Sequence, residues 1–176
     1  VSSYQGEVDW QRLAVQGVDF AFIKATEGSQ LQDRMFSANW QGAAQAGVRA
    51  GAYHFLSYDS PGETQADNFI SQVPVTPGSL PPVVDIEFYG PYLEQPPEKK
   101  QVKAILDPLL ERLEEHYGVK PILYVTYRSY YRYLATEYGD YPIWCSSPTV
   151  FPLVPRWSFW QYSHSAQLEG YSAAQK

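Results

Sequence analysis

The sequence predicts an α/β fold, in which the strands of a parallel sheet alternate with helices packed outside it. Apolar runs of strand length recur along the chain, and the first four begin roughly 30 to 40 residues apart, about the length of a strand–helix unit. Between these runs lie segments whose apolar residues recur at helical spacing. Such alternation is typical of a parallel sheet covered by helices.

The predicted strands are short apolar runs that end in polar residues. They cover residues 18–24, 49–55, 82–87 and 121–126, followed by two shorter runs at 141–145 and 157–162. An open doubly wound sheet and a barrel both fit this pattern. Open sheets that bind nucleotides usually carry a glycine-rich phosphate loop after an early strand, and no such loop follows the early runs here. Barrels place their chemistry at the carboxyl ends of strands, where the polar residues of this chain gather.

Three helices are predicted between the strands. Asp33 is expected to cap the first, with a buried face of Phe36, Trp40, Ala43 and Ala44 and an end at Gly47. Residues 60–63 have the form of a capping box with proline at the first helical position, before a helix that buries Ala66, Phe69, Ile70 and Val73. The longest runs from about residue 97 to 117 and stops at Gly118, with a buried stripe of Val102, Ile105, Leu106, Leu109 and Leu113.

The length of the chain limits the size of the barrel. An eightfold β/α barrel typically needs about 250 residues, whereas this chain has 176. We therefore expect a shortened, irregular TIM-like β/α barrel with a helix-poor second half, formed by a single domain over residues 1–176. Because the chain starts at Val1 and not at Met, we expect a processed or excised piece.

Composition excludes several classes of function. A net charge of −6 argues against nucleic acid, which requires a basic face. No run approaches the about 20 apolar residues of a membrane span. A lone Cys145 allows no internal disulfide. His116 and His164 lack partners at metal-ligand spacing. We therefore expect no metal, no cofactor and no membrane or nucleic-acid partner, and we expect a monomer.

The aromatic content points to a flat ligand. The chain has 15 Tyr and 5 Trp, and aromatic faces stack on the apolar faces of sugar rings. Any single aromatic residue is more readily explained as part of the core. Only their sum favours a carbohydrate or another flat ligand.

Asp85 and Glu87 are the strongest catalytic candidates. Side chains alternate along a strand, so these acids share one face while Val84 and Ile86 occupy the other. Mutual repulsion is expected to raise the pKa of one acid and leave the other ionised. Glycoside cleavage uses such a pair, with one acid protonating the leaving oxygen and one carboxylate stabilising the cationic transition state. The alternative is a strand end whose acids are bonded to the backbone or to basic neighbours.

Two further groups have both a structural and a functional interpretation. Lys24 and Glu27 end the first run, and a salt bridge from Lys24 to an acid is at least as plausible as contact with a substrate. His54 could act as a general base, but a lone histidine on a strand is more often a packed, hydrogen-bonded core residue. We favour the core interpretation for His54.

A series of motifs in order along the chain resembles glycoside hydrolase family 25, the Chalaropsis-type lysozymes. These blocks are Val1–Gly6 with Val8-Asp9-Trp10, residues 22–28, Asn39, residues 51–55, Gln65-Ala66 with Phe69, residues 82–87, 120–124, 142–144 and 157–162. The resemblance implies a β/α barrel with irregular last strands. It also implies hydrolysis of the β-1,4 bond between N-acetylmuramic acid and N-acetylglucosamine in peptidoglycan, on the outside of a cell or facing its wall, by a secreted or phage-delivered enzyme.

The resemblance also implies roles for individual residues. Glu87 matches the general acid of the family, and Asp85 the carboxylate that orients and stabilises the acetamido group of the substrate. Other residues match the walls of the substrate cleft: Tyr53, Tyr124, Lys24, Glu27, Trp160, Gln161 and Tyr162.

The chain departs from the family pattern at both ends. The pattern has an Asp immediately before the Val-Ser-Ser block, and a last strand with a further acid after the Gly170-Tyr171 region. We expect that these two site acids are absent because the chain was trimmed at both ends, and not because they were substituted. Two alternatives stay open, namely an inactive glycan-binding module that keeps the aromatic wall, and a chitinase-like hydrolase, because a strand-borne Asp-x-Glu pair also serves substrate-assisted chitin cleavage.

Overall fold

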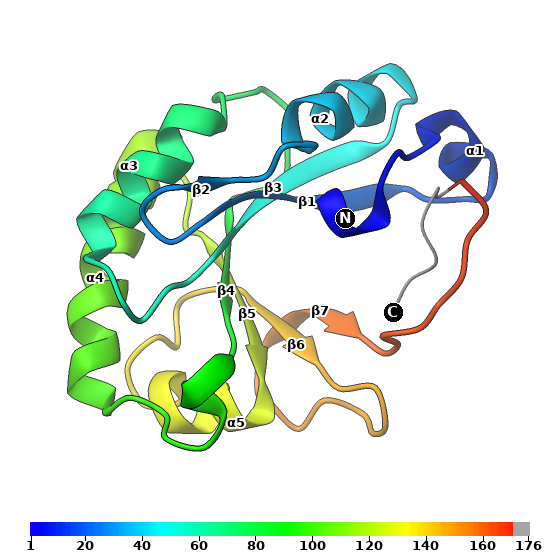
Figure 1. Cartoon of the computed structure of the whole chain (residues 1–176). Coiled ribbons are helices and arrows are strands. Elements are labelled where there is room, and N and C mark those ends of the chain that lie inside the picture. Colours follow the sequence, from blue (N-terminus) through cyan, green and yellow to red (C-terminus); the bar gives the residue numbers. More distant parts are fainter. Residues whose placement is uncertain (171–176) are drawn as a thin grey trace.

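The computed structural model describes residues 1–170, and its centre is a seven-stranded sheet (Figure 1). The strand order is β2-β1-β3-β4-β5-β6-β7, and all neighbours are parallel except the β1–β2 hairpin. The strands are β1 (Phe20–Glu27), β2 (Leu31–Gln32), β3 (Arg49–Phe55), β4 (Val83–Ile86), β5 (Ile122–Thr126), β6 (Ile143–Ser146) and β7 (Trp157–Gln161). The predicted α/β class and all six predicted strands are confirmed.

The longer helices cover the outer side of the first half of the sheet (Figure 1). They are α1 (Trp10–Val15), α2 (Phe36–Gln45), α3 (Gly62–Gln72) and α4 (Lys99–Tyr117). Short helical turns lie at Ser3–Gln5 and Gly90–Leu93. Within the described residues, the only helical elements after β5 are α5 (Tyr127–Ser129) and a single π-helical turn at Tyr130–Leu134. The second half of the fold is therefore poor in helices, as predicted.

The sheet separates two apolar regions. Val84 and Ile86 point outward and pack with the Leu106, Leu109 and Leu113 stripe of α4. The inner face carries a smaller cluster of Phe22, Val83, Ile122 and Tyr124, with Trp144 and Phe159 packed against it. This alternation along β4 is the one that the sequence predicts, and it turns Asp85 toward the inner face.

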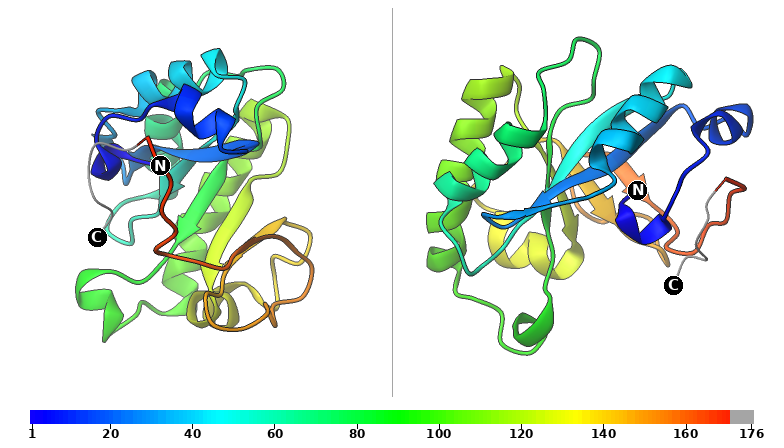
Figure 2. Two further views of the ribbon diagram at one scale, coloured as in Figure 1. Left: turned by 90° about the vertical axis from the view of Figure 1, so that its right-hand side faces the viewer. Right: turned by 45° about the horizontal axis from the view of Figure 1, so that its top comes forward.

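The sheet curves until its first and last parallel strands approach one another (Figure 2). The ring of Phe159 on β7 lies 5.7 Å from that of Phe20 and 5.4 Å from that of Phe22, both on β1. Within residues 1–170, no ladder of hydrogen bonds joins β7 to β1. The sheet is thus mixed and mostly parallel, while its closure into a barrel stays a prediction. Residues 171–176, next to which the family pattern has its last strand, lie outside the described residues.

The starts of α2 and α3 differ from the predicted caps. Asp33 does not cap α2, because its carboxylate accepts hydrogen bonds from the backbone N–H groups of Ser3 and Met35, and the helix begins after Met35. Ser60 does not cap α3, which begins at Gly62 with Pro61 before it, at the cap position and not at the first helical position. A Cβ on Gly62 would lie 1.9 Å from the carbonyl oxygen of Ile105. The close approach of α3 to α4, and not a side-chain cap, therefore sets this start.

The buried faces of the helices agree with the prediction except at four residues, of which Trp40 and Ile70 are only partly buried. Ala44 is exposed, because α2 turns Asn39 and Ala43 inward instead. Ile105 is only partly buried, and Leu110 joins the stripe of α4 in its place. The end of α4 is as predicted, since Gly118 adopts a left-handed conformation with φ of 70°.

Candidate active site

A pocket of about 310 Å³ opens at the carboxyl ends of the central strands. It collects five of the residues singled out in the sequence, namely Asp85, Glu87, Tyr53, Tyr124 and Gln161. The remaining lining residues are Val1, Phe22, Val83 and Trp144. These side chains come from strands spread over most of the chain, so the pocket is a product of the curved sheet.

Strand register explains why the acids and tyrosines meet. Asp85 on β4 pairs with Tyr124 on β5, which in turn pairs with Trp144 on β6. Tyr53 on β3 pairs with Val83, two residues before Asp85. Because paired residues of neighbouring strands point to the same side of a sheet, all of these side chains face inward.

Asp85 is held in an environment that disfavours its charge. It is 8% exposed, and its Oδ1 atom is buried without a hydrogen-bond partner in the described structure. Burial raises the pKa of Asp85 well above its usual value, the negative charge of Glu87 and the contact with it raise this pKa further, and the charge of Lys24 opposes the shift. The raised pKa that the sequence predicts for one acid of the pair thus falls on Asp85, whose neutral form is favoured.

Glu87 lies one residue beyond the end of β4 and is half-buried at the pocket. Its backbone carbonyl accepts a hydrogen bond of 2.9 Å from the Tyr58 hydroxyl. The side chain is therefore carried by a strand end and a short connecting segment, with access to solvent that Asp85 lacks.

Tyr53 and Tyr124 are neutral phenols in this pocket. Burial is the main cause that raises the pKa of each hydroxyl, and the charges of Asp85 and Glu87 raise both further. A neutral phenol donates one hydrogen bond. The ring of Tyr124 also packs edge-on against Trp144, with 4.7 Å between centroids. The pocket thus combines two carboxyl groups, two phenol donors and an apolar floor.

Lys24 and Glu27 form an ion pair beside this pocket and do not line it. The Lys24 Nζ atom lies 2.6 Å from Glu27 Oε2, and Lys24 is buried while Glu27 is half-buried. Both residues line a neighbouring polar hollow of about 220 Å³, together with Asp33 and Arg34. The salt-bridge interpretation of Lys24 is therefore confirmed in part, with Glu27 as partner, and a role in substrate contact stays a prediction.

The last strand presents its predicted residues on two sides. Gln161 faces the pocket. Trp160 faces away, donates its indole N–H to the Ser147 carbonyl at 2.9 Å and packs against Phe151. Tyr162 is 70% exposed and lies next to Trp160. Trp160 and Tyr162 thus lie apart from the two acids, and their part in substrate binding stays a prediction.

The chain matches a known family over nearly all of its length. The sequence model described as "Glycosyl hydrolases family 25" matches residues 1–171. This chain belongs to that family. A solved family 25 glycosyl hydrolase from Bacillus anthracis is 46% identical with a TM-score of 0.93, covering 97% of this chain and 80% of that chain. The solved bacterial lysozyme of Streptomyces coelicolor is 31% identical with a TM-score of 0.86, covering 99% of this chain and 86% of that one.

Curated relatives of this family 25 chain are longer than the chain itself. Lysozyme M1 of Streptomyces globisporus is 32% identical over 192 residues, which are 98% of this chain and 63% of that protein. Relatives from Escherichia coli are 34% identical over 97% of this chain and 64% of their own length. The family 25 chain thus spans a little under two thirds of the length of these four curated relatives.

Several pocket residues of the family 25 chain escaped the sequence analysis. Phe22 and Val83 line the pocket two residues before Lys24 and Asp85, so strand alternation alone could have found them. Trp144 joins through its register with Tyr124, which no local pattern encodes. Val1 reaches the pocket because its N–H and C=O groups bond to the Phe22 carbonyl and the Lys24 N–H along the free edge of β1.

His54 has the structural role that the sequence favoured. It is fully buried, with Nδ1 at 2.8 Å from the Thr26 hydroxyl and Nε2 at 2.9 Å from Gln65 Oε1. Burial lowers its pKa to about 4. His54 is therefore a neutral, hydrogen-bonded core residue of the family 25 chain near neutral pH.

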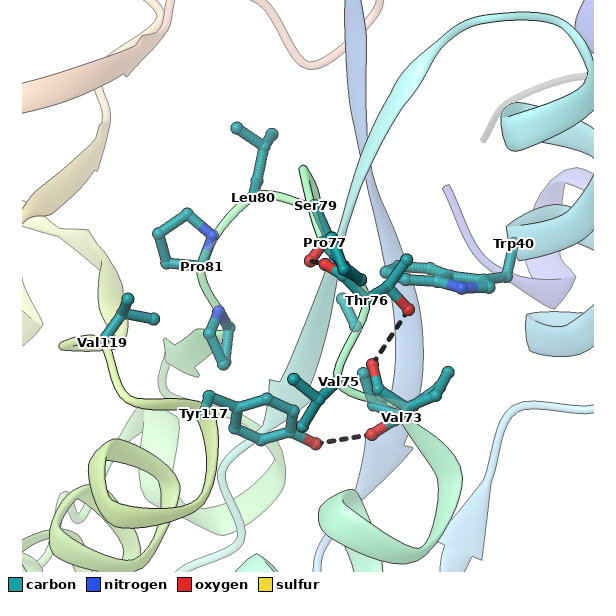
Figure 3. Close-up of a pocket in the computed structure, with 13 residues that line it drawn as sticks. Trp40, Val73, Val75, Thr76, Pro77, Ser79, Leu80, Pro81, Tyr117 and Val119 are labelled. Atoms are coloured by element: carbon teal, nitrogen blue, oxygen red, sulfur yellow. Dashed lines mark hydrogen bonds between the residues drawn. The ribbon is translucent and has the colours of Figure 1, made fainter.

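A second cavity lies at the opposite end of the sheet, where β4 and β5 begin (Figure 3). It measures about 270 Å³, and its walls are mainly proline and apolar side chains such as Trp40, Val75 and Leu80. Its only titratable residue is Tyr117, whose hydroxyl donates to the Val73 carbonyl at 2.8 Å (Figure 3). Of these two pockets, only the one at Asp85 and Glu87 therefore has the carboxyl groups needed for acid–base chemistry.

No helix within residues 1–170 combines the length and apolar character needed to cross a bilayer. Among the same residues, no group of three or more His, Cys, Asp or Glu side chains is arranged around a possible metal position.

Proposed function

We propose that this family 25 chain is a muramidase that hydrolyses the β-1,4 bond between N-acetylmuramic acid and N-acetylglucosamine in bacterial peptidoglycan. One observation carries the proposal: two carboxyl groups, the buried Asp85 with its raised pKa and the half-buried Glu87, line the same pocket. Membership of the family and the similarity to proteins named as lysozymes support it.

In the proposed mechanism Glu87 is the general acid. Its half-exposed position at the end of β4 suits a group that must reach a leaving oxygen and later meet water. Glu87 donates a proton to the oxygen of the departing sugar as the glycosidic bond breaks. The carboxylate that remains then accepts a proton from the water that completes hydrolysis, which returns Glu87 to its starting state.

Asp85 is the orienting and stabilising carboxylate in this scheme. Its unpartnered Oδ1 atom can accept a hydrogen bond from the acetamido N–H of the bound sugar. A donor at that atom favours the ionised form of Asp85, so the proton shared by the pair moves toward Glu87 when substrate binds. The acetamido oxygen of the substrate then attacks the anomeric carbon, and the negative charge of Asp85 stabilises the positive charge that develops.

The remaining pocket residues bind the sugar. Tyr53 and Tyr124 donate hydrogen bonds from neutral phenols, and Trp144 supplies an apolar face. We include Gln161 in the same wall, and Lys24, Glu27, Trp160 and Tyr162 as contacts to more distant parts of the substrate. The partner is thus the peptidoglycan glycan strand, and a monomeric enzyme acts on it outside the cell or at its wall.

The decisive experiment is Glu87→Gln, with clearing of peptidoglycan and release of reducing ends as readouts. Loss of the general acid should lower turnover by about 10²–10⁴-fold without unfolding the protein. The matched control is Glu111→Gln on the exposed side of α4, which should keep full activity. Full turnover by Glu87→Gln would refute the assignment of the acid.

The choice of substrate separates this proposal from its alternatives. Wild-type protein that binds glycans saturably and releases no reducing ends is a binding module. Cleavage of chitin oligomers in preference to peptidoglycan identifies a chitinase-like enzyme. Preference for peptidoglycan is the result that the proposal requires.

A further inference from the structure

We infer that Tyr58 is a positioning residue for Glu87, acting through the backbone of the segment that follows β4. The inference rests on the proposed function, in which Glu87 is the general acid. Tyr58 does not line the pocket of Asp85 and Glu87. Its hydroxyl instead donates to the carbonyl oxygen of Glu87 at 2.9 Å.

Glu87 needs such support because the sheet ends before it. The last paired residue of β4 is Ile86, opposite Val125, and the β3 side of the ladder ends with the bond from the Leu56 N–H to the Asp85 carbonyl. The backbone of Glu87 is thus outside the strand that holds Asp85. A hydrogen bond to its carbonyl from a buried side chain limits rotation of the peptide unit that carries the catalytic carboxyl group.

Tyr58 is itself held rigidly. It is 9% exposed, and its ring stacks on that of Tyr89 with centroids 5.5 Å apart and planes inclined by 4°. The ring of Tyr92 packs on it edge-on at 5.1 Å. Its backbone N–H donates to the Tyr89 hydroxyl at 2.9 Å. Because these contacts hold the Tyr58 ring in place, its hydroxyl can hold the backbone carbonyl of Glu87 in one position.

The segments that follow β3 and β4 each donate hydrogen bonds to the other. Tyr58 donates from its hydroxyl to Glu87 and from its N–H to Tyr89, while the Asp59 carboxylate accepts hydrogen bonds from the hydroxyls of Tyr92 and Tyr89. The two loops are therefore cross-linked by four hydrogen bonds close to the general acid. Catalysis is sensitive to such support, because a displacement of about 1 Å can reduce rate by about 10²-fold.

Tyr58→Phe tests the inference, since it removes the hydroxyl and keeps the stacked ring. The matched control is Tyr117→Phe, which breaks an equivalent bond of 2.8 Å from a tyrosine hydroxyl to the Val73 carbonyl at the other end of the sheet (Figure 3). Both variants should lose a similar small amount of thermal stability. Only Tyr58→Phe should lower kcat, by about tenfold or more, with KM changed by less than about twofold and with an altered pH profile of kcat.

A spectroscopic readout makes the result independent of turnover. The side-chain carboxyl carbon of Glu87 can be assigned by NMR through its absence in Glu87→Gln. Its signal should shift or broaden in Tyr58→Phe and stay unchanged in Tyr117→Phe. An unchanged Glu87 signal together with an unchanged kcat would overturn the inference, even where Glu87→Gln is inactive and the proposed function holds.

Other outcomes are also decisive. Should the wild type cleave no glycan, the proposed function fails, and the NMR comparison alone decides whether Tyr58 positions Glu87. Should Tyr58→Phe fold poorly, it is compared with the wild type at a lower temperature at which both proteins are folded, because only this variant removes the bond to Glu87. A lower kcat and a shifted Glu87 signal are expected there as well, and a kcat and a signal equal to those of the wild type would contradict the inference.

Discussion

Asp85 on β4 lies directly opposite Tyr124 on β5, and both side chains face the same pocket. The pairing brings a phenol donor beside a carboxyl group whose charge is disfavoured by burial. Because parallel register decides which residues are neighbours, a shift of β5 by one residue would place Leu123 or Val125 there instead. The chemistry of the pocket therefore depends on the register of two central strands.

Tyr124→Phe should lower kcat/KM by about tenfold, since it removes one donor while the ring and its contact with Trp144 remain. Stability should change little for the same reason. Tyr131→Phe is the control, because Tyr131 is 58% exposed and does not line the pocket. Equal kcat/KM for Tyr124→Phe and the wild type, measured on soluble peptidoglycan fragments, would exclude the Tyr124 hydroxyl from catalysis.

Asp85→Asn should abolish turnover and yet stabilise the fold at neutral pH. The pKa of Asp85 is raised in the folded state, so the folded protein loses stability as pH rises from the unfolded value of about 4 toward the raised one. The neutral amide of the Asp85→Asn variant carries no such penalty. We expect its free energy of unfolding to be higher by about 1 kcal/mol, a common size for a single stabilising substitution.

Urea unfolding as a function of pH measures this effect. The difference in unfolding free energy between Asp85→Asn and the wild type should grow as pH rises from about 4. The exposed Asp19 offers a control, since Asp19→Asn should not reproduce the trend. A lower stability of Asp85→Asn at pH 7 would show that the ionised carboxylate is favourable in the fold.

His54 should make the fold sensitive to acid. Its pKa is lowered from 6.5 to about 4 by burial, so the neutral form is the one that the folded state prefers. The stability linked to His54 is fully present above about pH 6.5 and is lost as pH falls toward about 4, up to about 3 kcal/mol in total.

An NMR titration of the imidazole isolates this contribution, because Asp85 acts in the opposite direction over part of the same range. The expected midpoint for His54 is about pH 4. Replacement of the exposed His116 by Asn should leave the acid sensitivity unchanged. A His54 midpoint near 6.5 would mean that its pocket is open to solvent.

Much of the fold could be predicted because the signals for strands and for α4 are local. Apolar runs predicted β1, β3, β4, β5, β6 and β7 to within a few residues, and the stripe of α4 with Gly118 at its end was also correct apart from Ile105. The caps failed at Asp33 and Ser60 because tertiary contacts outweighed local preference. Asp33 holds the N-terminal segment, and Gly62 allows α3 to approach α4.

The site was predictable in part for the same reason. Alternation along the predicted strand 82–87 turns Asp85 and Glu87 to one side, and both line the pocket although β4 itself ends at Ile86. The position of Trp144 and the support from Tyr58 escaped prediction. Each depends on contacts between segments that are far apart in the sequence or lie in different loops.

The amino-acid sequence by itself thus determined the order of strands and helices, and the spacing that turns Asp85 and Glu87 to the same side at the end of β4. Only the tertiary structure decided which groups surround that pair and how strongly Asp85 holds its proton. The physical reason is that side-chain direction is a local property of the backbone. Burial and charge–charge interaction, in contrast, depend on the curvature and register of strands that are distant along the chain.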